Sequence, residues 1–336
     1  MRGRVHAWVR RWWSGGGGWP GALLSGLLRP LEWGYAAVVV WRGRRFDRTG
    51  GTRVPGVWVV SVGNLSVGGT GKTPLASWAV DELTASGRSV AVVARGYGRD
   101  ELRLHQRWHP DVPVIADADR VAGTLAARSA GADAVVLDDG FQHRRLARDV
   151  DLVLVSAEDP VPGRLLPVGP YREPWTALER AHAVVVTRRT ASAAEAAAVA
   201  ADVEARLGAG TPVGRVALLP GGWRSLSDGP AEGPEGPILV ATAVARPEAV
   251  AAHVAATGAG PVELAAYPDH HDFGEGDARA IRARAGGRPV AVTEKDAVKL
   301  DRFADILGDV RVLLLHPVWE HGRDEVAAVV AGTGAP

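Results

Sequence analysis

The sequence predicts an α/β protein whose first part is built on a parallel sheet, and three observations carry this prediction. An apolar run at 57–62 leads into a glycine-rich turn and then into a segment with helical periodicity. Short apolar runs go on alternating with helical segments along the chain. One of these runs ends in the acid pair Asp138-Asp139. Alternation of this kind indicates parallel strands with ligands bound at their carboxyl ends.

The composition is that of a globular protein and excludes several classes of function. The 336 residues suffice for two ordinary domains or one large one. A formal net charge of +1 argues against a nucleic-acid partner, and the absence of cysteine excludes disulfides and thiolate metal sites. The few lysines of this arginine-rich chain, Lys72, Lys295 and Lys299, mark places where a compact ammonium is favoured.

An arm at residues 1–50 is rich in arginine and tryptophan. Up to Arg53 there are ten arginines against two acids, and six of the twelve tryptophans lie here. The apolar stretch 19–41 is interrupted by Arg29, Pro30 and Glu32, so we do not expect it to span a bilayer. Tryptophan rings between guanidinium groups are typical of a membrane-interface segment. We predict an amphipathic, membrane-associating arm; an ordinary first helix packed on the core is the alternative.

The turn after the first strand has the composition of a phosphate-binding P-loop. Gly68, Gly69, Thr70 and Gly71 allow the backbone N–H groups to point at phosphate oxygens, and a helix begins at the next residues, Lys72-Thr73. The lysine would reach the β- and γ-phosphates, and the threonine hydroxyl would bind Mg²⁺. Ser66 stands where such loops usually have their first glycine. A fortuitous glycine turn is the alternative to a nucleoside triphosphate site.

The first domain is expected at 51–232. Further strands are predicted at 89–94, 114–116, 134–137, 151–156 and 183–187, with helices at 119–130 and 191–207, a polar connection at 100–113 and a linker at 227–237.

Polar residues follow the predicted strand 134–137. Asp138 and Asp139 occupy the place of a Mg²⁺-binding carboxylate downstream of a P-loop, although a plain turn with a solvated acid pair is also possible. Gln142 and His143 could orient phosphate or substrate, or stabilise the turn. The pair Arg172-Glu173 in a proline-rich loop could be a ligand clamp or a surface ion pair.

A smaller α/β domain is expected at 233–336. Strands are predicted at 238–242, 262–266, 289–293 and 310–315, and helices at 246–256, 275–285 and 321–331. Between its strands, His270 and His271 lie between two acids. The sequence indicates no third ligand for a metal ion at these histidines. An acid or base role for one histidine is therefore favoured. The segment 293–299 follows a strand and could be a simple helix start.

Taken together, six motifs resemble those of the tetraacyldisaccharide 4'-kinases. They occur in that family's order and cover nearly the whole chain: 62–74, Arg95-Gly96-Tyr97-Gly98, 138–143, 166–174, 268–271 and 293–299. The resemblance implies two α/β/α sandwich domains, with ATP bound at the P-loop in the cleft between them. It implies transfer of the γ-phosphate to the 4'-hydroxyl of a tetraacylated glucosamine disaccharide 1-phosphate, a lipid A precursor.

The resemblance also implies roles for individual residues. Lys72 and Thr73 would serve the phosphates and Mg²⁺, with Asp138 and Asp139 in the metal shell. Around the same nucleotide we expect four polar residues and one lysine: Gln142, His143, Arg172, Glu173 and Lys295.

The chain departs from the family at the segment that carries the catalytic base. An intervening loop is missing, and Arg99-Asp100-Glu101 stands in its place. Asp100 is the best match for the base, and His270 matches the histidine that pairs with it.

The resemblance places the enzyme on the cytoplasmic face of the bacterial inner membrane, as a peripheral protein with no obligatory protein partner. A different P-loop phosphotransferase and a membrane-bound nucleotide switch are the alternatives. Both would share the loop lysine and the acid pair.

Overall fold

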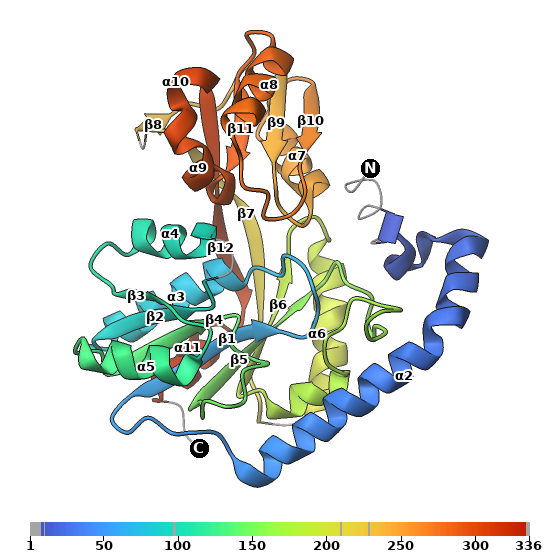
Figure 1. Cartoon of the computed structure of the whole chain (residues 1–336), viewed down its shortest axis with the longest axis vertical. Coiled ribbons are helices and arrows are strands. Elements are labelled where there is room, and N and C mark those ends of the chain that lie inside the picture. Colours follow the sequence, from blue (N-terminus) through green and yellow to red (C-terminus); the bar gives the residue numbers. More distant parts are fainter. Residues whose placement is uncertain (1–7, 10, 97–98, 209, 228, 334–336) are drawn as a thin grey trace. The chain divides into compact units, whose positions relative to one another are not determined.

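The computed structural model describes residues 8–9, 11–96, 99–208, 210–227 and 229–333. Tyr97 and Gly98 of one motif and residues 1–7 and 10 of the arm lie outside the described residues. The chain forms two compact units. The larger unit comprises Arg4–Tyr97, His105–Ala217 and Trp319–Pro336, and the smaller comprises Gly98–Leu104 and Leu218–Val318. Figure 1 labels the elements of both.

The larger unit contains a parallel sheet whose strands alternate with helices. Its strands are β1 (Trp58–Asn64), β2 (Val90–Ala94), β3 (Val114–Ala116), β4 (Ala134–Asp138), β5 (Val150–Ser156), β6 (Ala183–Arg188) and the start of β7 (Val213–Ser225). Their order is β7-β6-β5-β1-β4-β2-β3. Every pairing along this path is parallel. The predicted α/β class with a parallel sheet is therefore confirmed.

Helices cover both faces of this sheet. Register puts Val59 of β1 and Val153 of β5 on one face, where α5 (Arg120–Ser129) and α6 (Ala193–Leu207) bury alanine and valine side chains against them. The opposite face packs against α3 (Lys72–Ala85) and α11 (Arg323–Ala331). The strands are apolar on both faces because each face is covered, and the result is an α/β/α sandwich.

The smaller unit repeats this arrangement. Its sheet has the order β10-β9-β11-β12, from β9 (Ile238–Thr242), β10 (Val262–Ala266), β11 (Val290–Thr293) and β12 (Val310–His321). Helix α7 (Pro247–Ala256) packs on one face. The other face packs against α8 (Glu275–Ala285), α9 (Glu294–Leu300), η3 (Asp301–Phe303) and α10 (Ala304–Leu307). This is a second α/β/α sandwich.

The division between the units differs from the boundary expected at 232/233. The smaller unit begins at Leu218, and Trp319–Pro336 return to the larger unit, where α11 packs against α3. The cause is the length of β7 and β12, which each run from one unit into the other. The expected linker also contains β8 (Pro230–Ala231), which pairs antiparallel with the end of β7.

The polar connection expected at 100–113 is wrong, because most of it is helix α4 (Arg99–Trp108). Asp100, Leu104 and His105 are buried at helical spacing. A helix whose buried face carries ionisable residues escapes a search for apolar periodicity. Helix α4 contributes its first half to the smaller unit and its second half to the larger one.

The arm forms η1 (Trp12–Gly16) and the long helix α2 (Gly18–Thr49), which continues through Pro30. Glu32 is buried and accepts a hydrogen bond from Leu165 N at 3.0 Å. Among the described helices, α2 alone has the length and mean hydropathy of a membrane-spanning segment, a test that signal sequences and core helices also pass. Only 6% of its apolar window is buried, so this is not the helix of a protein core.

Candidate active site

The glycine-rich turn joins β1 to α3 in the larger unit. Gly68 has φ of 120° and Gly71 has φ of 92°, conformations that glycine adopts without strain. Gly71 is the N-cap of α3, so Lys72 and the buried Thr73 are the first residues of that helix. A curled backbone followed by a helix N-terminus is an anion-binding arrangement. The loop therefore has the local structure that phosphate binding requires.

Residues at or just after the ends of β5 and β6 make hydrogen bonds to the loop. Thr187 Oγ1, at the end of β6, donates to Thr70 O at 2.8 Å, and Arg189 donates to Gly69 O. Ser66 Oγ donates to Asp159 Oδ2 at 2.6 Å. The serine that replaces the usual glycine thus ties the loop to the segment after β5. Thr187 and Arg189 were missed from the sequence because no motif marks a residue that only holds another loop.

The two acids at the end of β4 differ in their surroundings. Asp138 is 1% exposed, and its Oδ2 lies 3.1 Å from His105 Nε2 of α4, which is itself buried. Asp139 has φ of 58°, and its Oδ1 lies 3.7 Å from Lys72 Nζ. Arg172 Nη1 lies 3.3 Å from the same carboxylate. The structure therefore brings Asp139, rather than Asp138, to the loop lysine.

Electrostatics keep Asp139 ionised. Burial raises its pKa, but Lys72 and Arg172 together outweigh burial and hold the pKa below its ordinary value. An ionised carboxylate beside the first turn of α3 is a suitable ligand for a hard cation.

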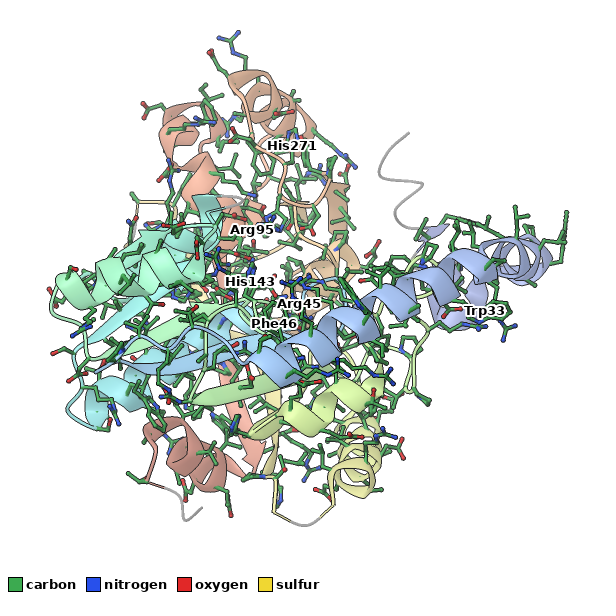
Figure 2. The ribbon with its side chains drawn as sticks, turned by 60° about the horizontal axis from the view of Figure 1, so that its bottom comes forward. Trp33, Arg45, Phe46, Arg95, His143 and His271 are labelled. Carbon is green, nitrogen blue, oxygen red and sulfur yellow. The ribbon has the colours of Figure 1, made fainter. Side chains whose placement is uncertain are left out.

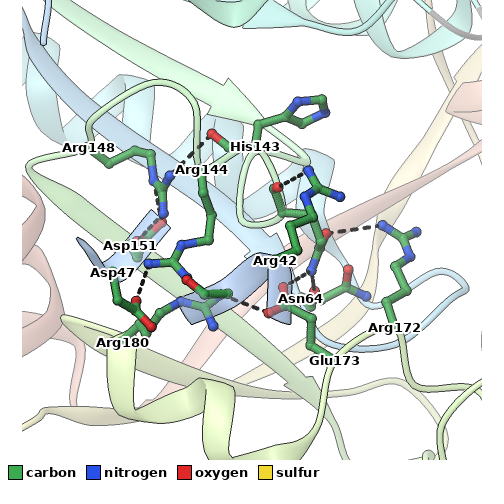
Figure 3. Close-up of polar contacts among 12 residues, drawn as sticks. Arg42, Asp47, Asn64, His143, Arg144, Arg148, Asp151, Arg172, Glu173 and Arg180 are labelled. Carbon is green, nitrogen blue, oxygen red and sulfur yellow. Dashed lines mark hydrogen bonds and ion pairs between the residues drawn. The ribbon is translucent and has the colours of Figure 1, made fainter. Parts of the chain in front are cut away.

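Gln142, Arg172 and Glu173 form one hydrogen-bonded cluster beside Asn64. Figure 3 labels Asn64, Arg172 and Glu173 of this cluster. Gln142 Nε2 donates to Asn64 O at 2.9 Å and to Glu173 Oε1 at 3.1 Å. Asn64 Oδ1 in turn accepts from Lys72 Nζ at 3.3 Å. Four of the predicted residues, these three and Lys72, thus lie in one connected network. Asn64, which links them, was not singled out from the sequence.

Helix α2 contributes to the same cluster. Tyr35 Oη donates to Arg172 O at 2.9 Å, and Arg42 Nη2 donates to Gln142 O at 3.2 Å. Figure 2 shows α2 running along the larger unit, with Phe46 near its inner end and Trp33 farther along. The arm is therefore joined to the residues around the loop.

His143 lies among cations. Burial and the guanidinium groups of Arg120 and Arg95 lower its pKa to about 4, so this imidazole is neutral near pH 7. Arg120 is 3% exposed, and its Nε and Nη2 have no hydrogen-bond partner within the described part of the chain. A buried guanidinium with spare donors near Asp139 suits an anionic ligand. Arg120 was missed from the sequence because an arginine at a helix start has an ordinary structural explanation.

The smaller unit brings the predicted base and histidine together. His270 Nδ1 lies 3.2 Å from Asp100 Oδ2, and Asp100 is 2% exposed. Burial raises the pKa of Asp100, but the hydrogen bond with His270 and the charges of Lys295 and Lys299 lower it well below its ordinary value. The same hydrogen bond raises the pKa of His270, against the effect of burial. Lys295 Nζ is 2.9 Å from Glu101 Oε1.

Backbone strain marks two of the predicted residues. Among the described residues, Asp139 and His270 are the non-glycine residues with positive φ, and both have φ of 58°. Such conformations cost free energy and concentrate at functional sites. His270 N is held by Ala243 O at 3.0 Å, which fixes the strained turn.

Metal binding rests on few protein ligands. No group of three or more His, Asp or Glu side chains able to hold a metal occurs in the described residues. Mg²⁺ commonly takes one or two carboxylates and completes its shell with water and substrate phosphates. The Thr73 hydroxyl and the Asp139 carboxylate fit that donor set.

Comparison with known proteins gives one family. The family model for LpxK, tetraacyldisaccharide-1-P 4'-kinase, matches residues 24–107 and 99–329. A tetraacyldisaccharide 4'-kinase of Anaeromyxobacter dehalogenans is 37% identical over 95% of this chain and 93% of its own. One from Halorhodospira halophila is 36% identical over 81% and 83%.

A solved structure agrees with these sequence matches. It is the apo form of LpxK from Aquifex aeolicus in complex with ATP, and it is similar with a TM-score of 0.71 and 25% identity. The similarity covers 92% of this chain and 99% of that one. This chain therefore belongs to the tetraacyldisaccharide-1-P 4'-kinase family.

Proposed function

We propose that this protein transfers the γ-phosphate of ATP to the 4'-hydroxyl of a tetraacyldisaccharide 1-phosphate. The observation that carries the proposal is the loop between β1 and α3, whose Lys72 Nζ lies 3.7 Å from the strained Asp139, in a chain of a kinase family. Transfer of a phosphoryl group depends on positioning and charge neutralisation more than on a strong base. The loop positions the phosphates, and the lysine and the carboxylate contribute to charge neutralisation.

The larger unit binds the nucleotide in this proposal. The N–H groups of Gly68–Gly71 and the start of α3 receive the phosphates, and Lys72 leaves Asp139 to contact the β- and γ-phosphates. Thr73 and Asp139 would hold Mg²⁺, which would neutralise charge on the phosphates. Asp138, paired with His105, supports the turn from the interior. Arg172 and Gln142 fix Asp139 and the loop through their hydrogen bonds.

The smaller unit supplies the proton acceptor. Asp100 takes the proton of the 4'-hydroxyl, and His270 orients the carboxylate and shares that proton. Because phosphoryl transfer has little bond formation to the attacking oxygen, a carboxylate of low basicity suffices.

The pH dependence of kcat tests this pair. Protonated His270 withdraws charge from Asp100, so the carboxylate is a better acceptor once His270 is neutral. Since the pKa of His270 is raised above 6.5, we expect kcat to increase with pH through a midpoint above that value. In His270→Gln this rise should disappear and kcat should fall about a hundredfold. An unchanged profile in His270→Gln would remove the histidine from the mechanism.

Helix α2 binds the cytoplasmic surface of the inner membrane in this proposal. Trp19, Leu23 and Leu27 recur every four residues and are 76%, 67% and 76% exposed. Residues at this spacing form one stripe along a helix. An apolar stripe with arginines nearby suits the interface of an anionic bilayer. Because α2 also contacts Arg172 and Gln142, membrane binding brings this cluster close to the lipid surface.

Replacement of the stripe tests the membrane role without deleting α2. The triple variant Trp19→Ser, Leu23→Ser and Leu27→Ser should bind anionic vesicles at least about a hundredfold more weakly, since each buried side chain contributes about 1.5–3 kcal/mol. Leu125→Ser is the matched control, because Leu125 is 46% exposed on α5. Equal sedimentation of both variants with vesicles would exclude α2 as the anchor.

The activity itself is tested by ATP consumption in detergent, with and without tetraacyldisaccharide 1-phosphate. The proposal expects ADP formation that depends on the lipid and on Mg²⁺. Slow turnover that is indifferent to the lipid would instead indicate a nucleotide switch.

A further inference from the structure

Lys299 is a nearly buried cation between two carboxylates of the smaller unit. Its Nζ lies 3.6 Å from Asp100 Oδ2 and 3.9 Å from Asp296 Oδ1, and its side chain is 10% exposed. The ring of Phe273 lies below it, with its centroid 5.7 Å from Nζ. Nζ has no hydrogen-bond partner within the described residues. Charge, rather than a hydrogen bond, therefore holds this ammonium in place.

Asp296 is a rigid anchor for the ammonium. It is 0% exposed, and its Oδ2 accepts from Thr242 Oγ1 at 2.6 Å and from Thr293 Oγ1 at 2.7 Å. Its Oδ1 accepts from Ala243 N at 2.9 Å. Burial raises the pKa of Asp296 above its ordinary value, and the charge of Lys299 and the three donors oppose this shift. A carboxylate with three fixed donors has a single orientation, so Lys299 has a fixed partner on one side.

The other side of Lys299 faces the proposed base. Asp100 Oδ2 receives both His270, at 3.2 Å, and Lys299, at 3.6 Å. Its Oδ1 is buried and has no partner among the described residues. One oxygen is thus held by two groups, and the other remains available as an acceptor.

We infer that Lys299 is a positioning residue for the reaction, which holds the Asp100 carboxylate ionised and oriented through the anchored pair Asp296–Lys299. The inference rests on the proposed function, in which Asp100 accepts the hydroxyl proton. Lys299 acts together with His270 and Lys295 against the burial of Asp100, so the loss of Lys299 would raise the pKa of this carboxyl group.

The choice of lysine supports this role. The chain has 39 lysines and arginines together, yet lysine occurs three times, and two of the three lie on α9. Lys295 pairs with Glu101 and Lys299 with Asp100, so α9 holds two successive acids in the first turn of α4. A compact ammonium fits between two carboxylates and a ring, where a planar guanidinium is larger.

Lys299→Met tests the inference by its effect on pH dependence. The charged groups around Asp100 are His270 and Asp269 on their loop, Lys295 and Asp296 on α9, and Glu101 on α4. Loss of the ammonium should raise the pKa of Asp100 and, because the carboxylate then interacts more strongly with imidazolium, that of His270. We expect the rise of kcat with pH to move upward by about one unit, with kcat about tenfold lower at pH 6. The KM for ATP should stay within about twofold, because Lys299 acts on the base.

A second measurement does not depend on turnover. In ¹³C-histidine-labelled protein, the resonance of His270, assigned by its loss in His270→Gln, should titrate at higher pH in Lys299→Met than in the wild type. Arg279→Met, which removes a side chain that is 72% exposed on α8, should leave both profile and titration unchanged. If a folded Lys299→Met protein has the same pH profile of kcat and the same His270 titration as the wild type, the inference is overturned.

Two further outcomes are distinguishable. If Lys299→Met does not fold, Lys299→Arg is used instead, because it keeps the charge on a longer side chain. We expect a lower kcat in Lys299→Arg and the same pH midpoint as in the wild type. A wild-type kcat in Lys299→Arg would contradict the inference. If the wild type shows no lipid-dependent ATP consumption, the proposed function fails. The His270 titration then still decides whether Lys299 is coupled to Asp100 and His270.

Discussion

Lys72→Ala is expected to reduce lipid-dependent kcat by about 10²–10³, the usual cost of losing one group that stabilises charge in the transition state. Nearby Arg172 and Asn64 are held by the cluster around Gln142, so they cannot take over its contact with the β- and γ-phosphates. Asp139 would also lose one of the two cations that keep its pKa low. The measurement is steady-state ADP formation at saturating lipid, with the ATP concentration varied.

Arg206→Ala is the matched control for the loss of a cation from the larger unit. Arg206 pairs with Glu179 on the surface, at 2.8 Å, and should leave kcat unchanged. Exposed ion pairs of this kind contribute about 0–1 kcal/mol to stability. Wild-type kcat in a folded Lys72→Ala protein would mean that the turn between β1 and α3 does not bind the transferred phosphate.

Asp100→Asn should lower kcat by about 10²–10⁴, the range attributed to a positioned acid or base. Asparagine keeps the shape of the side chain and can still pair with His270, but it cannot accept a proton. The Kd for ATP, measured by calorimetry, should stay close to that of the wild type, because nucleotide binding is assigned to the larger unit. A fall in kcat with unchanged Kd separates the base from the phosphate-binding residues.

Asp269→Asn provides the control for a nearby carboxylate. Asp269 lies 4.0 Å from the other nitrogen of His270 and is more exposed than Asp100, so its loss should change kcat by less than about tenfold. If Asp269→Asn lost activity and Asp100→Asn kept it, the base would be misassigned.

The sheet and the phosphate loop were predictable because their signals are local. Strands such as β1, β2 and β4 are buried on both faces, so they read as continuous apolar runs. Gly68 and Gly71 adopt positive φ, the conformation that makes glycine informative in a turn. These features depend on residues within a few positions of one another.

Pairings between distant segments could not be predicted in the same way. Residues Asp138 and Asp139 are adjacent, yet one faces His105 and the other faces Lys72, because the chain turns with φ of 58° at Asp139. A sequence does not say which of two adjacent acids points into the interior. His105 and Thr187 were missed because their roles depend on partners 33 and 117 positions away.

The polar helix α4 was the largest error in the fold. Its Asp100 and His105 are buried by pairing with His270 and Asp138, whereas a solvated loop would expose them. Buried ionisable residues at helical spacing are rare in ordinary helices and are typical of functional sites. The prediction of a polar connection therefore failed in the segment that carries the predicted base, Asp100.

The most direct measurement follows the transferred phosphate. Wild-type protein is incubated with γ-³²P-labelled ATP, Mg²⁺ and tetraacyldisaccharide 1-phosphate in detergent, and the position of the label is determined by chromatography and mass spectrometry of the lipid product. We predict label on the 4'-oxygen in the wild type and almost none on the lipid in Asp100→Asn, which still binds ATP. Label released as inorganic phosphate at the same rate with and without the lipid would contradict the proposed kinase reaction.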